Sequence, residues 1–167
     1  NTQKSFRRFT SRDDFCILLC MKKYYIKNFG CQMNESDSER IAAFLEKQNY
    51  KSAKNMESAD LIVVNACSVR QTAIDRIFGL KKKFKNFKAK KILTGCVIKS
   101  DEPKFKEFFD KILSINDFFK YHKFSDRTNY GKNYLEIKSK HLYKNSAFVP
   151  IMTGCDNFCS YCVVPYT

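Results

Sequence analysis

The chain has 167 residues, 44% of them hydrophobic, and a formal net charge of +14. This hydrophobic content is enough for a packed core and excludes a wholly disordered chain. The longest apolar runs, at 15–21 and 61–64, are too short for a membrane-spanning helix. The charge favours a polyanionic partner such as RNA, although a genome that favours lysine would produce the same excess.

The first twenty residues differ from the rest of the chain. They precede the first methionine, Met21, and lack the small-residue cleavage site of a secretory signal. We therefore expect residues 1–20 to be a non-native or disordered upstream extension, and we assign Cys16 and Cys20 no role. Without a secretory signal we expect a cytoplasmic, reducing compartment, in which clustered thiols bind metal rather than form disulfides.

From Met21 the sequence follows a repeating order of strand, small residue, cysteine and helix. Residues 23–29 are rich in aromatic and β-branched side chains and predict a strand, which ends at Cys31. A helix is predicted from about Ser36, because Ser36 and Glu39 have the spacing of a capping box.

Two further units repeat this order. Residues 59–66 form a continuous apolar run that is typical of a buried parallel strand, and Cys67 follows. Residues 90–94 predict a third strand, followed by Gly95 and Cys96. The helical positions expected to face inward are Ala73, Ile77, Leu80 and Phe84 in the second unit, and Phe105, Phe108 and Phe109 in the third.

Residues 111–116 predict a fourth strand, followed by a short helix. Strands that alternate with helices predict an α/β fold, here a Rossmann-like parallel sheet with flanking helices over residues 21–125. Residues 126–146 are polar and basic and are expected to be a linker, within which 134–137 resembles a short strand. The apolar residues 147–152 predict a new strand, which would begin a second domain at 147–167.

Three cysteines are predicted at the same edge of the sheet. Cys31, Cys67 and Cys96 each follow Gly or Ala at the carboxyl end of a strand, where parallel sheets bind ligands. A single such cysteine would most simply be a buried side chain, but three in one topological place predict a shared metal site. Three thiolates suit an iron–sulfur cubane with one open iron. Zinc, which needs a fourth Cys or His ligand, is the alternative.

A second group of cysteines follows residues 147–152. Cys155, Cys159 and Cys162 have the spacing C-x3-C-x2-C, with Tyr161 before the last. Three thiolates in one tight loop can bind three irons of a 4Fe–4S cluster and leave the fourth open. This pattern resembles the signature of the radical S-adenosylmethionine (SAM) enzymes. The resemblance implies that SAM binds the open iron and is cleaved to a 5′-deoxyadenosyl radical, and that Tyr161 lies against the SAM adenine.

The segments FGCQMNESDSER, NACSVRQTA, TGCV and GCDNFCSYCVVPYT together resemble the methylthiotransferase family of radical SAM enzymes. The resemblance runs from about Lys22 to Thr167. It implies two 4Fe–4S clusters, the radical SAM cluster on the second group of cysteines and an auxiliary cluster on Cys31, Cys67 and Cys96. It also implies a chain truncated within the first strand and cluster loop of a radical SAM partial (β/α) barrel, and inactive alone.

Within this family the segments are most similar to the tRNA-modifying branch. The resemblance then implies a transferase that methylthiolates C2 of isopentenyladenosine at position 37, next to the tRNA anticodon. The implied partners are a tRNA anticodon stem-loop and an electron donor such as flavodoxin or ferredoxin, while the sulfur donor stays unknown. We expect a cytoplasmic monomer that does not bind membranes.

Several alternatives stay open at the level of sequence. The substrate within the family could instead be threonylcarbamoyl-adenosine in tRNA or an aspartate of a ribosomal protein. A non-enzymatic iron–sulfur electron carrier and a zinc-binding RNA module are alternatives from other classes. Residues 81–83 are three lysines that could face RNA, but such a run is more often a solvated helix face, and they are assigned no role.

Overall fold

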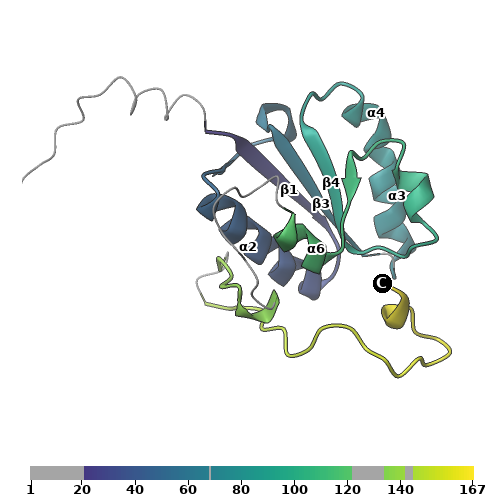
Figure 1. Ribbon diagram of the computed structural model, residues 1–167. Helices are drawn as coiled ribbons and strands as arrows, with labels where there is room; N and C mark the ends of the chain where they lie inside the picture. The colour runs from purple at the N-terminus through teal and green to yellow at the C-terminus, as the bar shows by residue number, and fades with distance from the viewer. Residues whose placement is uncertain (1–20, 68, 122–133, 142–144) are drawn as a thin grey trace, which may run out of the picture.

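The computed structural model describes residues 21–67, 69–121, 134–141 and 145–167. Within these residues five strands form one sheet in the order β2-β1-β3-β4-β5, and every neighbouring pair is parallel (Figure 1). The predicted Rossmann-like parallel sheet is therefore confirmed. The strands are β1 (Lys23–Phe29), β2 (Lys51–Ser52), β3 (Leu61–Cys67), β4 (Lys90–Cys96) and β5 (Lys111–Ile112).

Helices cover both faces of this sheet, α2 and α6 on one side and α3 and α4 on the other (Figure 1). In the described part of the chain, no helix combines the length and apolarity needed to cross a membrane. The helices are α2 (Gln32–Lys47), α3 (Gln71–Gly79), α4 (Lys81–Phe84), α5 (Glu102–Phe105) and α6 (Ile115–Lys120), with 3-10 turns η1 (Met56–Ser58), η3 (Tyr134–Glu136) and η4 (Val164–Tyr166).

The central strand β3 explains why the sheet has two cores. All seven of its residues are buried, because β1 and β4 flank it and helices cover both its faces. Leu61 and Val63 pack against α2 and α6, where Phe44 meets Phe119 edge to face with ring centroids 5.3 Å apart. On the other face, the predicted stripe of Ala73, Ile77, Leu80 and Phe84 is buried, as are Phe105 and Phe109, while Phe108 is half-buried.

The start of α2 differs from its prediction. The helix begins at Gln32, not near Ser36, and Cys31 is its N-cap residue. Asn34 accepts a hydrogen bond from the Cys31 backbone N–H, which completes a capping box one turn earlier than predicted. The sequence misled because cysteine is not among the usual N-cap residues.

Two short strands predicted after β4 also differ. The fourth predicted strand, 111–116, is only Lys111–Ile112, because Ser114 caps α6 by accepting a hydrogen bond from the Asp117 N–H. The residues 134–137, expected to resemble a strand, begin with the 3-10 turn η3. Tyr134 and Ile137 pack against α2, so this part of the predicted linker contacts the sheet domain.

The strand predicted at 147–152 is not formed in the structure. Val149, Ile151 and Met152 are exposed, and the segment has no strand assignment. An isolated strand leaves its backbone N–H and C=O groups unpaired, and no described strand lies beside this one. Whether 147–167 begins a second domain stays a prediction. The upstream extension 1–20 and linker residues 126–133 and 142–144 lie outside the described residues.

Candidate metal centre

The structure brings Cys31, Cys67 and Cys96 to one edge of the sheet. Cys67 and Cys96 are the last residues of β3 and β4 and are aligned in register. Cys31 follows β1 by two residues and caps α2. The carboxyl ends of these three adjacent strands meet at the lower end of the sheet in Figure 1.

The three cysteines also share a face of the sheet. Alternate residues of a strand point to the same face, so Cys67 points to the same side as Asn65, and the Asn65 side chain contacts α2. Cys96 has the same orientation through its register with Cys67. The thiols therefore gather where α2 begins, and the partial positive charge of a helix N-terminus favours thiolates there.

The electrostatics of Cys96 reflect this proximity. The pKa of Cys96 is raised from 9.0 to about 11, chiefly by burial and then by the neighbouring Cys67, Asp37 and Cys31, while Thr167 lowers it. Because of this repulsion, ionisation of a neighbouring thiol makes ionisation of Cys96 less favourable. A bound cation would offset the repulsion, because metal binding deprotonates coordinating thiols.

A buried pair of asparagines connects two of the cysteine positions. Asn34 accepts hydrogen bonds from the Cys31 N–H at 3.0 Å and the Cys31 Sγ at 3.4 Å, and its Nδ2 donates to Asn65 Oδ1 at 2.9 Å. Asn34 Nδ2 also donates to the carbonyl of Ala66 at 3.1 Å, and Asn65 Nδ2 donates to the carbonyl of Asn34 at 2.8 Å. These hydrogen bonds join the first turn of α2 to the end of β3, directly before Cys67.

This asparagine pair was missed by sequence reasoning. Both side chains are fully buried, and a polar residue at position 65 inside an otherwise apolar strand was the available signal. Buried polar side chains are generally hydrogen-bonded. Asn65 therefore indicated a buried hydrogen bond, but the local sequence could not identify its partner.

We expect Asn65→Ala to lower the free energy of unfolding by about 2–4 kcal/mol, because it leaves buried partners on Asn34 unpaired and opens a cavity. Urea unfolding monitored by circular dichroism measures this. Thr94→Val is the matched control, since Thr94 is buried opposite Asn65 in β4 and its hydroxyl has no hydrogen-bond partner within the described residues. It should be neutral or stabilising by about 1 kcal/mol. Equal losses from both variants would contradict the role of the pair.

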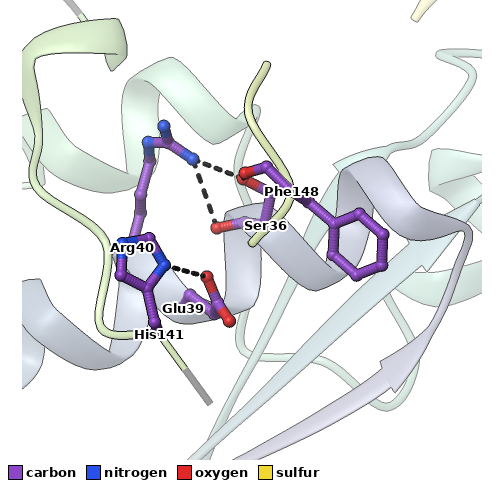
Figure 2. A network of polar contacts seen from close by, with 5 residues as sticks. All are labelled: Ser36, Glu39, Arg40, His141 and Phe148. Carbon is purple, nitrogen blue, oxygen red and sulfur yellow. Dashed lines mark hydrogen bonds and ion pairs between the residues drawn. The ribbon is translucent and has the colours of Figure 1, made fainter. Parts of the chain in front are cut away.

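Beyond its first turn, α2 carries a row of buried polar side chains that contact residues 134–141 and Phe148. Arg40 Nη1 donates to Ser36 Oγ at 2.5 Å, and Glu39 Oε2 lies 3.6 Å from His141 Nδ1 (Figure 2). Ser36 Oγ donates in turn to the carbonyl of Phe148 at 3.2 Å. These contacts fix the path of the chain along α2 towards the second group of cysteines.

Asp37 lies in the same row and is held by Tyr134, whose hydroxyl donates to Asp37 Oδ1. Burial raises the pKa of Asp37 from 3.8 to about 6, although the hydrogen bond from Tyr134 and the charge of Arg40 both lower it. The folded state therefore favours the protonated carboxyl. Its contribution to stability is complete below pH 3.8 and is lost as the pH rises through about 6.

We expect Asp37→Asn to stabilise the fold by about 2–3 kcal/mol at pH 7.5 or above, because a shift of about two pKa units is worth roughly that much. Asparagine keeps the acceptor for Tyr134 and cannot ionise. The gain should vanish near pH 4, where the aspartate is protonated in the fold. Unfolding midpoints across this pH range test the expectation. Asp75→Asn, on the exposed face of α3, is the control. If both variants showed the same pH profile, the role of the Asp37 carboxyl would be contradicted.

The second group of cysteines lies in the segment that follows Phe148. The Cys162 N–H donates to the carbonyl of Cys159 at 3.0 Å, so these two share one turn. Cys159 is exposed, Cys155 and Cys162 are half-buried, and the cysteines of the described residues form no disulfide. Tyr161 is 91% exposed. Its contact with the adenine of SAM therefore stays a prediction.

The cysteines at the sheet edge differ from a site for a single metal ion. Among the described residues, no three Cys, His, Asp or Glu side chains are grouped closely enough to bind a single ion. A zinc site requires all its ligands on one ion, whereas in a cubane cluster each thiolate binds a different iron. Three thiolates at three strand ends are the donor set of a cubane with one open iron.

Comparisons with known proteins identify a matching family and several relatives. Residues 23–115 match the family described as "Uncharacterized protein family UPF0004". Proteins named tRNA-2-methylthio-N(6)-dimethylallyladenosine synthase are 36% identical in Dictyoglomus thermophilum and 33% identical in Clostridium tetani, over 87% and 86% of this chain. A protein of the same name from Karelsulcia muelleri is 36% identical over 87% of the chain.

The chain spans 38% of the length of the Dictyoglomus protein and 36% of each of the other two. The matched family covers the whole parallel sheet, including the strand ends that carry Cys31, Cys67 and Cys96. The chain therefore belongs to the UPF0004 family, the N-terminal domain of the methylthiotransferases, as the sequence resemblance predicted.

Proposed function

We propose that the chain is part of a radical SAM methylthiotransferase that modifies tRNA, adding a methylthio group to C2 of isopentenyladenosine at position 37. The observation that carries the proposal is the gathering of Cys31, Cys67 and Cys96 at the N-terminus of α2, with a second cysteine group following in sequence. The printed names of the relatives, which describe synthases of a methylthio-adenosine in tRNA, support the substrate.

The residues have separate roles in this proposal. Cys31, Cys67 and Cys96 would hold an auxiliary 4Fe–4S cluster, and Cys155, Cys159 and Cys162 the radical SAM cluster, with Tyr161 beside the adenine of SAM. When bound, the two clusters supply the sulfur-carrying site and the electron that cleaves SAM. A radical is needed because C2 of the adenine carries an unactivated C–H bond, which a general base cannot readily deprotonate.

The protein's own contribution is positioning. The pair Asn34–Asn65 holds the backbone of Cys31 against the end of β3. Val163, Pro165, Tyr166 and Thr167 line one groove with residues 98–100, which follow Cys96, and this supports the idea that the segment after the second cysteine group works beside the first.

The partners follow from the same proposal. They are the anticodon stem-loop of tRNA and an electron donor such as flavodoxin or ferredoxin, in a cytoplasmic monomer. The net charge of +14 is compatible with binding to an RNA, because lysines that neutralise phosphates release counterions.

The test is nucleoside mass spectrometry on tRNA from cells that lack the gene. We expect the methylthio form to disappear and plain isopentenyladenosine to accumulate, with rescue by the wild-type gene and none by a Cys67→Ala variant. Loss of a methylthiolated threonylcarbamoyl-adenosine instead would move the substrate to that nucleoside. Unchanged tRNA would overturn a tRNA substrate altogether.

A further inference from the structure

The connection between α4 and β4 is unusually basic. Residues 81–91 contain seven lysines and no acidic residue. Lys90 is engaged within the fold, with its Nζ 3.0 Å from the Tyr121 hydroxyl and 4.7 Å from the centre of that ring. Lys82, Lys83 and Lys88 are exposed. The sequence alone could not separate a solvated helix face from a binding surface.

The structure shows that this stretch borders a groove. The groove has a volume of about 310 Å³ and lies between α4 and the turn at 106–110. Its charged lining consists of Lys81, Lys85, Lys91 and Lys106 together with Glu107 and Asp110, over the rings of Phe84, Phe108 and Phe109. We call this surface the lysine groove.

The two acids of the lysine groove are already engaged. Glu107 Oε2 lies 2.5 Å from Lys81 Nζ, and Asp110 Oδ2 accepts a hydrogen bond from the Lys91 backbone N–H at 2.7 Å. Both contacts are exposed. The hydrogen bond and charge of Lys81, followed by the charge of Lys85, lower the pKa of Glu107. Within the described residues, the side chains of Lys85, Lys91 and Lys106 form no ion pair, so their charges are available to a ligand.

The chemistry of the groove selects a phosphate backbone over an acidic protein. Lysine is depleted at protein–protein interfaces, whereas ammonium groups bind phosphates as compact point charges and gain affinity from counterion release. A run of lysines without arginine is suited to following a backbone rather than to forked, bidentate recognition of one carboxylate.

The position of the groove suits an RNA whose reacting base lies at the cysteine edge. Figure 1 shows α4 at the end of the sheet opposite the C-terminal segment. Lys91 and Cys96 are five residues apart in β4, which corresponds to about 17 Å along the strand. The stem of one RNA hairpin is long enough to cover this distance.

We propose that the lysine groove contacts the phosphate backbone of an RNA stem whose loop reaches the cysteine edge of the sheet. This rests on the proposed function for the identity of the RNA. The contact itself is a statement about phosphates and requires neither cluster nor modified base.

The experiment measures binding of an unmodified 17-nucleotide RNA hairpin to the complete gene product by fluorescence anisotropy, at a series of KCl concentrations. The variant is the triple substitution Lys85→Gln, Lys91→Gln and Lys106→Gln. The control is Lys22→Gln, Lys51→Gln and Lys54→Gln, which removes the same charge from exposed lysines at the β1–β2 edge. Circular dichroism establishes that both variants fold.

The groove variant should bind more weakly than wild type, and its plot of log affinity against log salt should be shallower by about two to three units, roughly one per lysine. The control should keep the wild-type slope. Equal slopes in both variants would overturn the proposal, and so would a groove variant that loses binding to an acidic electron-transfer protein while keeping the RNA slope. Because the hairpin is unmodified, failure here is distinct from failure of the nucleoside test.

Discussion

Replacing Cys67 by alanine in the complete gene product should lower its iron and acid-labile sulfide from about eight atoms of each to about four, the loss of one of two 4Fe–4S clusters. Cys67 is the suitable position because it is 4% exposed and lies in register with Cys96. Iron and sulfide analysis after anaerobic reconstitution measures the loss. Cleavage of SAM to 5′-deoxyadenosine should persist while methylthio transfer to tRNA is abolished.

The two groups of cysteines are each other's control in this experiment. Cys159→Ala, in the exposed turn with Cys162, should also remove about half of the iron but should abolish SAM cleavage. Equal loss of 5′-deoxyadenosine formation in both variants would refute the division of labour between the clusters. Bound zinc without acid-labile sulfide in the wild type would favour the zinc-binding RNA module, because a cluster always carries inorganic sulfide.

The sheet and its cysteine edge were predictable because their signals are local. The apolar run before Cys67 could be accommodated only in a strand covered on both faces, and all of β3 is buried. Cys31, Cys67 and Cys96 then follow from topology, since the carboxyl ends of parallel strands share one edge. The two-residue edge strand β2 carries no comparable pattern, and both its residues are exposed.

The features that prediction missed depend on contacts between distant residues. Tyr134 and Asp37 are 97 positions apart, and no periodicity links them, so the contact of residues 134–137 with α2 could not be predicted. The spacing of Ser36 and Glu39 predicted a capping box, but the helix starts earlier and both side chains are buried, Ser36 against Phe148 and Glu39 near His141. In sequence, a polar helix face that is buried by a later segment of the chain has the same pattern as a helix face exposed to solvent.

Gly95 is the position at which the smallest change should have the largest effect on the fold. Its φ of +101° lies in a region that side chains rarely adopt. An added Cβ would lie 2.4 Å from the carbonyl oxygen of Ala66 and 2.4 Å from Asn65 Oδ1. The Ala66 carbonyl oxygen belongs to the backbone of the central strand β3. It cannot move aside without separating β3 from β4.

We therefore expect Gly95→Ala to lower the free energy of unfolding by at least about 3 kcal/mol, which lowers the melting temperature by more than about 10 °C for a domain of this size. Because Gly95 pairs with Ala66 one residue before the Cys67–Cys96 pair, the same substitution should impair uptake of the auxiliary cluster. Thermal unfolding and iron analysis measure the two effects.

Two other glycines separate the contributions of space and conformation. Gly154 has a φ of +69° with nothing within 4 Å of an added Cβ, so Gly154→Ala carries the conformational cost alone, about 1 kcal/mol. Gly79, the last residue of α3, has open space around it and no positive φ, so Gly79→Ala should stabilise the helix by up to about 1 kcal/mol. If Gly95→Ala costs no more than Gly154→Ala, β4 can shift away from Ala66, and the close approach of β3 and β4 is not what holds Cys67 and Cys96 together.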